Sequence, residues 1–284
     1  MSKIAIVTDT DSSLTAELAA QHGICQVPIT IHFGEETYTT GVDIDDAKVF
    51  EIIDRVGNIP TTAAPPPGAF AKAFEEAFDA GADAVVCICV SGEISGTYNS
   101  ARTAGELFPE KEIEVIDSRN LSMGQGFMTI IAAEMAANGA SVAEIVAAVN
   151  DAGTRMHTFG VLATLKYLAM SGRVGKLAAG MATTLNIKPI LKVGDGKLDM
   201  LEKVRTQKKA FKRLVELAIK EKGAHNIERI ALTHVNNPEG AELLKGMLCE
   251  SLPCPEDVVI VPFSAGLSVH TGAGMVAVAF LTSK

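Results

Sequence analysis

One segment of the chain, Ala84–Val90, is apolar at every position and reads Ala-Val-Val-Cys-Ile-Cys-Val. Successive side chains of a strand point to opposite faces of a sheet, so a strand without polar positions must be covered on both faces. Such strands occur in parallel sheets that carry helices on both sides. The sequence therefore predicts an α/β protein in which this segment is a buried strand.

Further strands and helices alternate through the first half of the chain. The strands are expected at Ile4–Val7, Val27–Phe33 and Ile113–Ile116, and the helices from Leu14 to about Gln21 and from Met123 to about Ala137. The polar cluster after the first strand offers several N-caps for the first helix. This order predicts an N-terminal three-layer α/β/α domain with a parallel sheet, over residues 1–155.

The second half of the chain, residues 156–284, predicts a C-terminal α/β domain with a mixed sheet. Its expected strands are Phe159–Leu162, Ile190–Val193, Leu198–Leu201, Ile230–His234, Val258–Val261 and Met275–Leu281, with helices from about Gln207 to Lys222 and from about Glu239 to Glu250. Gly194-Asp195-Gly196 lies between two short strands and predicts a hairpin, which makes the sheet mixed. The domain boundary is expected near Gly153 to Thr158.

Composition narrows the class of partner. The 284 residues carry a formal net charge of -9 and have a pI near 5.2, so the chain lacks the basic face that nucleic acid or anionic lipid requires. The five cysteines argue against a secreted disulfide scaffold, and Cys87 and Cys89 are expected to be buried apolar residues. Without a signal-peptide pattern or a run of about 18 apolar residues, a cytoplasmic protein with no membrane segment is expected.

Small hydroxylated residues follow the apolar strand and form the first candidate ligand site. Ser95, Gly96 and Thr97 stand where the chain opens a helix, and the backbone N–H groups of such a turn favour an anion. The hydroxyls of Ser95 and Thr97 can donate further hydrogen bonds, while Gly96 permits a close approach. The alternative is that Ser95 is only the N-cap of the helix.

Two other segments supply candidate polar side chains. Thr61 and Thr62 precede three consecutive prolines, Pro65–Pro67, which hold the loop rigidly, although the pattern is equally typical of a plain connecting loop. His270 lies among glycines rather than on an apolar stripe, so its imidazole is a candidate to bond a carboxylate. A histidine bonded by the loop backbone is the alternative there.

Basic residues in two segments are notable in so acidic a chain. Arg173 stands in the segment Ser171–Lys176, and Arg205 stands close to Lys203, Lys208 and Lys209. Guanidinium and ammonium groups suit a phosphate or an acidic partner. A solvated helix face is the alternative for the second segment, and neither segment has the glycine spacing of a P-loop.

Several catalytic patterns are absent from the sequence. No Gly-x-Ser-x-Gly turn surrounds a serine, which argues against a hydrolase that uses Ser95 with His270. The remaining histidines show no metal-ligand spacing with the cysteines. Neither a metal site nor a cofactor is predicted.

The chain resembles the DegV family of bacterial fatty-acid-binding proteins from end to end. Nine segments match in the family's order, although each of them is weak by itself. They are Ile4–Ser13, Val27–Ile29, Gly41–Ile44, Pro60–Thr62, Ser95–Ala101, Val115–Ser118, Leu168–Lys176, Val204–Thr206 with Lys208–Ala210, and His270–Gly272.

This resemblance implies a two-domain fold with a fatty-acid tunnel near the domain interface. It implies a carrier in phospholipid metabolism rather than an enzyme, one that presents a long-chain fatty acid to a separate fatty-acid kinase for conversion to acyl phosphate. Arg173 and Arg205 would lie where the phosphate or the kinase arrives. The residues that the motifs place at the carboxylate are Thr62, Ser95 and His270, with Thr61, Gly96 and Thr97 beside them.

Three positions depart from the family pattern. Ala63 and Pro66 stand where the family loop has serines, so carboxylate bonds from those hydroxyls are absent. Ala273 stands where the family has proline. A stand-alone serine/histidine hydrolase or acyltransferase, and a regulatory module that binds lipid without a kinase, are the alternative functions.

Overall fold

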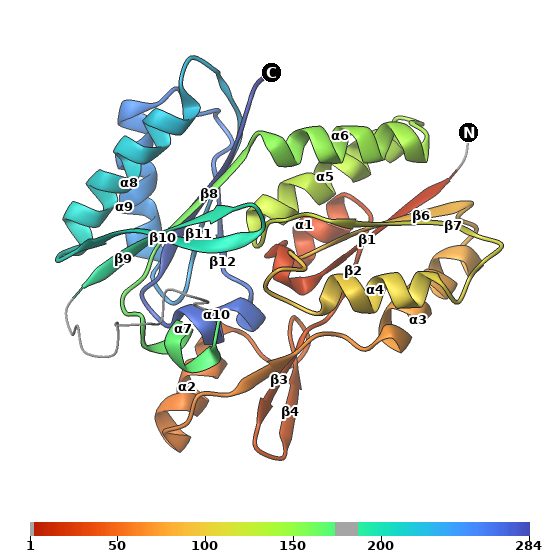
Figure 1. Ribbon diagram of the computed structural model, residues 1–284, viewed down its shortest axis with the longest axis horizontal. Helices are drawn as coiled ribbons and strands as arrows, with labels where there is room; N and C mark the ends of the chain where they lie inside the picture. The colour runs from red at the N-terminus through yellow and green to blue at the C-terminus, as the bar shows by residue number, and fades with distance from the viewer. Residues whose placement is uncertain (1–2, 174–186) are drawn as a thin grey trace.

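The computed structural model describes residues 3–173 and 187–284, and the apolar segment lies in its first sheet (Figure 1). This segment forms β6 (Ala84–Cys89), which is buried at every position. Its parallel neighbours are β1 (Ile4–Asp9) and β7 (Glu112–Asp117), and β2 (Ile24–Val27) pairs with the other edge of β1. The order β2-β1-β6-β7 confirms the predicted parallel sheet.

Helices cover both faces of this sheet. Val86 and Ile88 face the cluster of α1 (Ala16–Gln21), α5 (Met123–Ala137) and α6 (Val142–Thr154). Val85 and Cys87 face the opposite way, toward α3 (Pro67–Asp79) and α4 (Thr97–Gly105). The alternation of side chains along one apolar strand therefore places a helical layer on each side.

A small antiparallel sheet corrects one expected strand. Val27–Phe33 is not a single strand, because β2 ends at Val27 and β3 (Thr30–Phe33) begins after Pro28 in another sheet. There β3 lies between β4 (Glu36–Thr39) and β5 (Thr61–Ala63). Proline has no N–H to donate, so it does not continue the ladder of β2. The predicted rigid loop at Thr61 and Thr62 is thus a short edge strand.

The second half of the chain forms the mixed sheet that the sequence predicts. Its order is β10-β9-β8-β13-β11-β12, and among its described strands only β11 and β12 pair in parallel. Asp195 and Gly196 have positive φ values of 48° and 79° and form the tight turn of the β9–β10 hairpin, which confirms the predicted hairpin. The strands are β8 (Met156–Val161), β9 (Lys188–Gly194), β10 (Lys197–Val204), β11 (Ile227–His234), β12 (Val259–Pro262) and β13 (Val276–Thr282).

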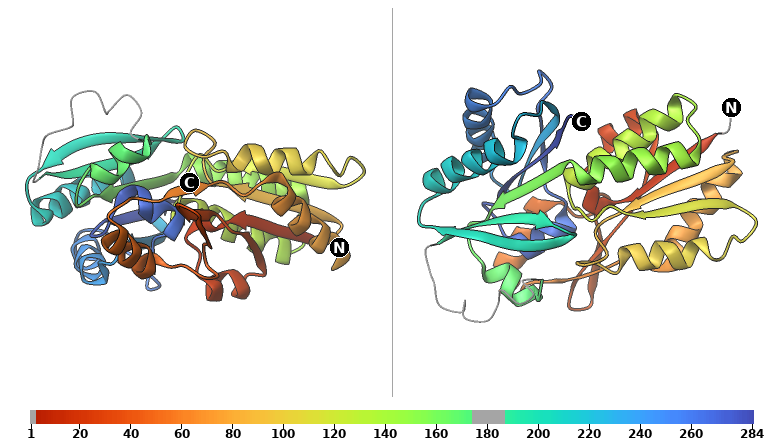
Figure 2. Two further views of the ribbon diagram at one scale, coloured as in Figure 1. Left: turned by 90° about the horizontal axis from the view of Figure 1, so that it is seen from below. Right: turned by 45° about the horizontal axis from the view of Figure 1, so that its top comes forward.

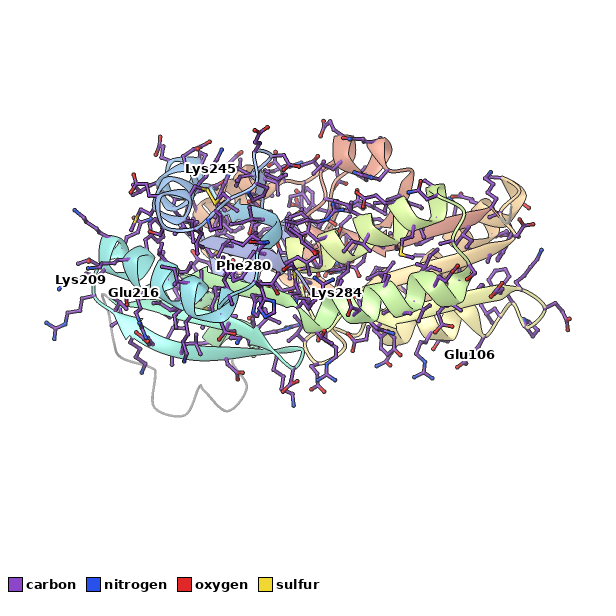
Figure 3. All side chains as sticks on the ribbon, turned by 90° about the horizontal axis from the view of Figure 1, so that it is seen from above. Glu106, Lys209, Glu216, Lys245, Phe280 and Lys284 are labelled. Atoms are coloured by element: carbon purple, nitrogen blue, oxygen red, sulfur yellow. A yellow bond between two sulfur atoms is a disulfide. The ribbon has the colours of Figure 1, made fainter. Side chains whose placement is uncertain are left out.

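The two faces of the mixed sheet have different surroundings. One face packs against α8 (Gln207–Lys222) and α9 (Pro238–Ser251), and Phe280 lies in that layer while Lys209 extends into solvent (Figure 3). The other face turns toward α2 (Asp46–Val56), α7 (Lys166–Ser171) and α10 (Ala265–Thr271). Helices α2, α3 and α6 were not among the expected elements.

The cysteines divide into one pair and three free thiols. Cys87 and Cys89 are buried in β6, as predicted, and Cys25 is exposed. Cys249 and Cys254 form a disulfide at the end of α9, which the sequence analysis did not predict. Within the two described ranges, no helix is long and apolar enough to cross a membrane.

Buried contacts join the two halves of the chain. The first hydrophobic cluster combines Ile6 and Ile88 with Ala279 and Leu281 of β13. The tip of the β9–β10 hairpin lies beside the first sheet (Figure 2). There the hydroxyl of Ser91, which follows β6, donates to the Gly196 carbonyl at 2.7 Å. The chain passes from α6 to β8 inside the expected boundary region, and the division into two domains stays a prediction.

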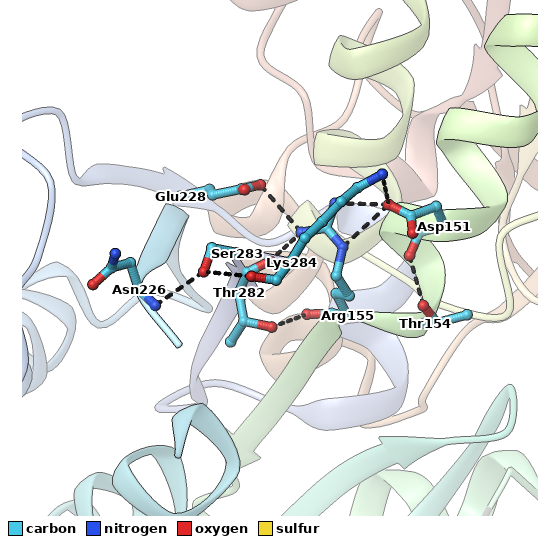
Figure 4. A network of polar contacts seen from close by, with 8 residues as sticks. All are labelled: Asp151, Thr154, Arg155, Asn226, Glu228, Thr282, Ser283 and Lys284. Atoms are coloured by element: carbon cyan, nitrogen blue, oxygen red, sulfur yellow. Dashed lines mark hydrogen bonds and ion pairs between the residues drawn. The ribbon is translucent and has the colours of Figure 1, made fainter. Parts of the chain in front are cut away.

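Arg155 stands at this passage and binds three elements (Figure 4). Its guanidinium donates to Asp151 of α6 at 2.9 Å, to Glu228 of β11 at 3.2 Å and to the Thr282 carbonyl of β13. The Arg155 side chain is only 18% exposed. A single planar group with several donors therefore fastens the end of α6 to two strands of the mixed sheet.

Replacement of Arg155 by Met is expected to lower the free energy of unfolding by about 1–3 kcal/mol, because it removes charged hydrogen bonds to half-buried acceptors, of which, among the described residues, only Asp151 keeps another cation, Lys284. Urea unfolding followed by circular dichroism measures this. Arg55→Met, at an exposed position of α2, is the control and should change stability by less than about 0.5 kcal/mol. Equal effects of the two variants would contradict the role of the Arg155 network.

Candidate ligand-binding site

A cavity lies between the mixed sheet, α10 and the carboxyl end of β6. Its volume is about 950 Å³, open solvent included. Most of its wall is aliphatic or aromatic. The polar side chains in the wall are Asp11, Thr62, Ser95, Thr158, Arg173, Lys192, His270 and Thr271.

Thr62 and His270 meet in this wall, although they are far apart in the sequence. The Thr62 hydroxyl lies 3.0 Å from Nε2 of His270. Thr62 comes from β5 and His270 from the last turn of α10. The expectation that His270 belongs to a glycine loop is therefore wrong: Gly272 ends a short helix that the sequence analysis missed, because a seven-residue helix has little periodicity to detect.

The surroundings of His270 keep its imidazole neutral. Burial, assisted by the positive charge of Arg173, lowers the pKa of His270 to about 4. A neutral imidazole donates from one ring nitrogen and accepts at the other. Nε2 is engaged by Thr62, and Nδ1 is buried without a hydrogen-bond partner among the described residues. Nδ1 is thus the open hydrogen-bonding position of this ring.

Ser95 and Gly96 contribute the turn before α4 to the same cavity. The Ser95 hydroxyl lies 2.8 Å from that of Thr97 and accepts from the Thr97 N–H at 3.3 Å. Gly96, rather than Ser95, occupies the N-cap position, and no side chain caps this helix. Ser95 therefore lies one residue before the N-cap, where its hydroxyl bonds the first N–H of the helix, and it also lines the cavity. Thr97 is fully buried and does not line the cavity.

The remaining predicted residues lie at the mouth or outside the wall. Arg173 is exposed, lines the cavity and donates to the Ser171 carbonyl at 2.8 Å, whereas residues 174–176 of its motif are outside the described residues. Thr61 is exposed on β5, and Arg205 is exposed between β10 and α8; neither lines the cavity. The alternative of a solvated helix face holds for Lys208 and Lys209, which are exposed on α8, but not for Lys203, which belongs to β10.

Sequence reasoning missed a carboxyl pair at the end of β1. Asp9 accepts hydrogen bonds from the backbone of Val90 and Asp11 and from the Gln125 amide, at 2.8 to 3.1 Å. Asp11 accepts from the Ser264 hydroxyl at 2.9 Å and lines the cavity. Burial raises the pKa of both groups, and the nearby charge of Asp9 raises that of Asp11 further. Asp9 accepts three hydrogen bonds and stabilises a negative charge better than Asp11 does. When one of the two carboxyl groups is protonated, the proton is therefore on Asp11.

The signal for this pair was present in the sequence. The cluster Thr8–Ser13 was interpreted only as a source of N-caps for the first helix. Its two acids follow a parallel strand directly, and the carboxyl ends of such strands are where ligands bind in open α/β sheets. The position of the two acids directly after a parallel strand could therefore have indicated a ligand site.

A third buried carboxyl group fastens the helix that carries His270. Asp46, in the first turn of α2, lies 2.6 Å from the Ser268 hydroxyl of α10 through Oδ1. Its Oδ2 is buried without a partner among the described residues. Burial raises the pKa of Asp46 to about 7. The neutral acid is favoured here, because an unpaired oxygen costs less without a charge.

Asp46 is expected to make folding stability fall as pH rises from about 4 to about 7. In that window the folded protein keeps a proton that the unfolded chain, with an aspartate pKa of 3.8, releases. The resulting decrease in the free energy of unfolding is at most about 4 kcal/mol and is complete above about pH 7. Asp46→Asn should make the unfolding free energy fall less steeply with pH over this range, where Asp9 and Asp11 also contribute, and exposed Asp54→Asn should leave the profile unchanged. A difference between wild type and Asp46→Asn that stays constant over this range would refute the assignment.

Comparisons with known proteins agree with this fold. A family model for uncharacterised proteins of the DegV family matches residues 3–283. A DegV domain-containing protein of Caldanaerobacter subterraneus subsp. tengcongensis is 36% identical over 96% of both chains. A Thermus thermophilus DegV family structure, described as showing fatty-acid binding, superimposes with a TM-score of 0.93 at 26% identity over 99% of this chain and 100% of its own. The fatty-acid-binding DegV of Bacillus subtilis gives 0.89 at 29% identity over the full length of both.

Proposed function

Because this chain belongs to the DegV family, we propose that it binds one long-chain fatty acid in the cavity and presents the carboxylate to a separate fatty-acid kinase. The observation that carries the proposal is an apolar cavity in which Thr62, Ser95 and His270, from three distant segments, form part of one wall. The Thermus thermophilus and Bacillus subtilis relatives are described as fatty-acid binding, which supports the ligand class.

The apolar wall supplies most of the binding free energy in this proposal. Burial of one methylene stabilises by about 0.8 kcal/mol, so a chain of about 16 carbons gains on the order of 10 kcal/mol before ordering costs. The tail then needs little help from the head group. Weak, neutral donors at the carboxylate are sufficient.

Neutral donors also suit a carboxylate that must react. A bidentate guanidinium would stabilise the carboxylate before reaction and slow its attack on a phosphoryl group. Thr62, Ser95 and the neutral His270 ring hold it without such a pair. In this proposal Arg173, which is exposed at the cavity wall, meets the phosphoryl group or the kinase, and Arg205, which is exposed outside the wall, belongs to the surface that contacts the kinase.

The alternative of a serine/histidine hydrolase gains no support from the geometry. Such an enzyme needs a hydrogen bond between the nucleophile and its base. Among the described residues His270 bonds to Thr62, and no bond to Ser95 is present.

Loss of head-group donors tests the proposal. Ser95→Ala and Thr62→Val are each expected to weaken fatty-acid binding by roughly 10- to 100-fold, as removal of one bond to a charged group does, and to slow acyl-phosphate formation on addition of kinase and ATP. Thr103→Val, an exposed position of α4, is the control and should match wild type.

Two measurements decide the outcome. Denaturing mass spectrometry of an organic extract shows whether about one fatty acid accompanies each purified chain. Calorimetric titration of delipidated protein then compares the variants. No ligand in the extract and no binding in the titration would refute the function, and unchanged affinity and turnover in both variants would refute the carboxylate site.

A further inference from the structure

Asp11 is the one acidic side chain in the described cavity wall, and the proposed function leaves it without a role. The residue is only 6% exposed, yet it lines the cavity. Oδ1 is engaged by the Ser264 hydroxyl, whereas Oδ2 accepts no hydrogen bond from the described residues. That oxygen is not among the fully buried unpaired atoms of the described residues, so it is open to the cavity, where a ligand can supply the partner that the protein does not.

The position of Asp11 separates it from the proposed carboxylate site. Its Oδ1 lies against Gly266, where an added Cβ would be 2.6 Å from it and 3.1 Å from Ile29. Gly266 precedes His270 by four residues of α10, which is about 6 Å along a helix. Asp11 therefore marks a second polar position, roughly one helical turn from the ring that faces the head group.

The neighbours of Asp11 determine which hydrogen bonds it can make. Three donors stabilise the anion at Asp9, and none of them reaches the free oxygen of Asp11. A neutral carboxyl group offers both an O–H donor and a carbonyl acceptor. A hydroxyl or keto oxygen on a ligand can bond to it, but a methylene cannot.

We propose that Asp11 is a second binding point of the cavity, specific for a hydroxyl or keto oxygen in the carboxyl half of an acyl chain. The inference rests on the proposed function and adds the class of ligand: an oxygenated fatty acid in preference to the plain saturated one. Thr62, Ser95 and His270 hold the carboxylate, and Asp11 binds an oxygen atom on the acyl chain.

Matched ligands test this on delipidated full-length protein. Stearate is compared by calorimetry with a set of hydroxystearates whose hydroxyl moves stepwise along the chain. Wild type is expected to bind at least one member with its hydroxyl in the carboxyl half about tenfold more tightly than stearate, as one added buried hydrogen bond provides.

Three variants separate recognition from packing. Asp11→Ala should lose the preference while its affinity for stearate stays equal or rises, because a polar group has left an apolar wall. Asp11→Asn keeps the shape and a donor, and should retain the preference. Ser264→Ala removes the bond to Oδ1 but leaves Asp11 in place, and should also retain it.

The outcomes that overturn the inference differ from those that overturn the function. Stearate binding without any hydroxystearate preference, or a preference that survives Asp11→Ala, removes the role of Asp11 alone. A marked loss of stearate affinity in Asp11→Ala would assign Asp11 to the carboxylate instead. If wild type binds neither ligand, the proposed function fails as well.

Discussion

Octanoate is expected to bind roughly four orders of magnitude more weakly than palmitate. The two ligands share the carboxylate and differ by eight methylenes, each worth about 0.8 kcal/mol when buried, less a fraction for ordering the chain. The wall that would receive those methylenes is predominantly apolar and includes Phe159, Leu162, Leu191, Val193 and Met275. Displacement of a fluorescent fatty acid, with each chain length kept below its micelle concentration, measures the series.

A head-group series provides the control for the tail. Hexadecanol keeps the chain and loses the charge, so it should bind only about 10- to 100-fold more weakly than palmitate if neutral donors hold the carboxylate. A head-group effect larger than the effect of eight methylenes would show that the carboxylate dominates affinity. That result would contradict the energetic basis of the carrier function.

Gly272→Ala is expected to destabilise the protein by about 3 kcal/mol and to weaken ligand binding with it. Gly272 ends α10 with a φ of 81°, which disfavours a side chain, and an added Cβ would fall on the ring of Tyr167. That ring packs edge-on against Phe50 at 5.9 Å. The contact therefore joins α10, α7 and α2, and a shift of α10 would move His270.

Gly57→Ala is the control for a helix-ending glycine whose added Cβ meets no neighbour, although its ψ of 3° tolerates a side chain better than the 161° of Gly272. Gly57 also ends a helix, α2, with a φ of 74°, but nothing lies within 4 Å of its added Cβ. The control should lose about 1 kcal/mol. Tyr167→Ala in the Gly272→Ala background should then recover part of the extra loss, as measured by urea unfolding. Equal losses at the two glycines would show that the ring contact is unimportant.

The sequence predicted the elements whose pattern is local. The apolar run at β6, the hairpin turn at Asp195 and Gly196, and the long helix α5 were all identified within one or two residues. Each has a periodicity or a turn residue that its own neighbours determine. Short elements such as β5 and α10 were missed or misplaced, because three to seven residues carry too little pattern.

The candidate site was predicted only as far as motifs allow. Thr62, Ser95, Gly96, Arg173 and His270 do line one cavity. The sequence also selected Thr61, Thr97 and Arg205, which lie outside its wall, since a motif marks a segment and cannot say which of its side chains point inward. The role of each residue at the ligand stays a prediction.

By itself, the sequence determined an α/β chain with a buried parallel sheet, a mixed sheet and a set of hydroxyl, imidazole and guanidinium candidates. Only the tertiary structure decided which of these candidates share a cavity, and that three carboxyl groups, Asp9, Asp11 and Asp46, are buried among them. The physical reason is that burial and pairing depend on contacts between distant segments, such as Asp11 with Ser264 and Asp46 with Ser268. The order of residues within one segment does not show which distant segment will contact it, whereas the pKa of a carboxyl group depends almost entirely on such contacts.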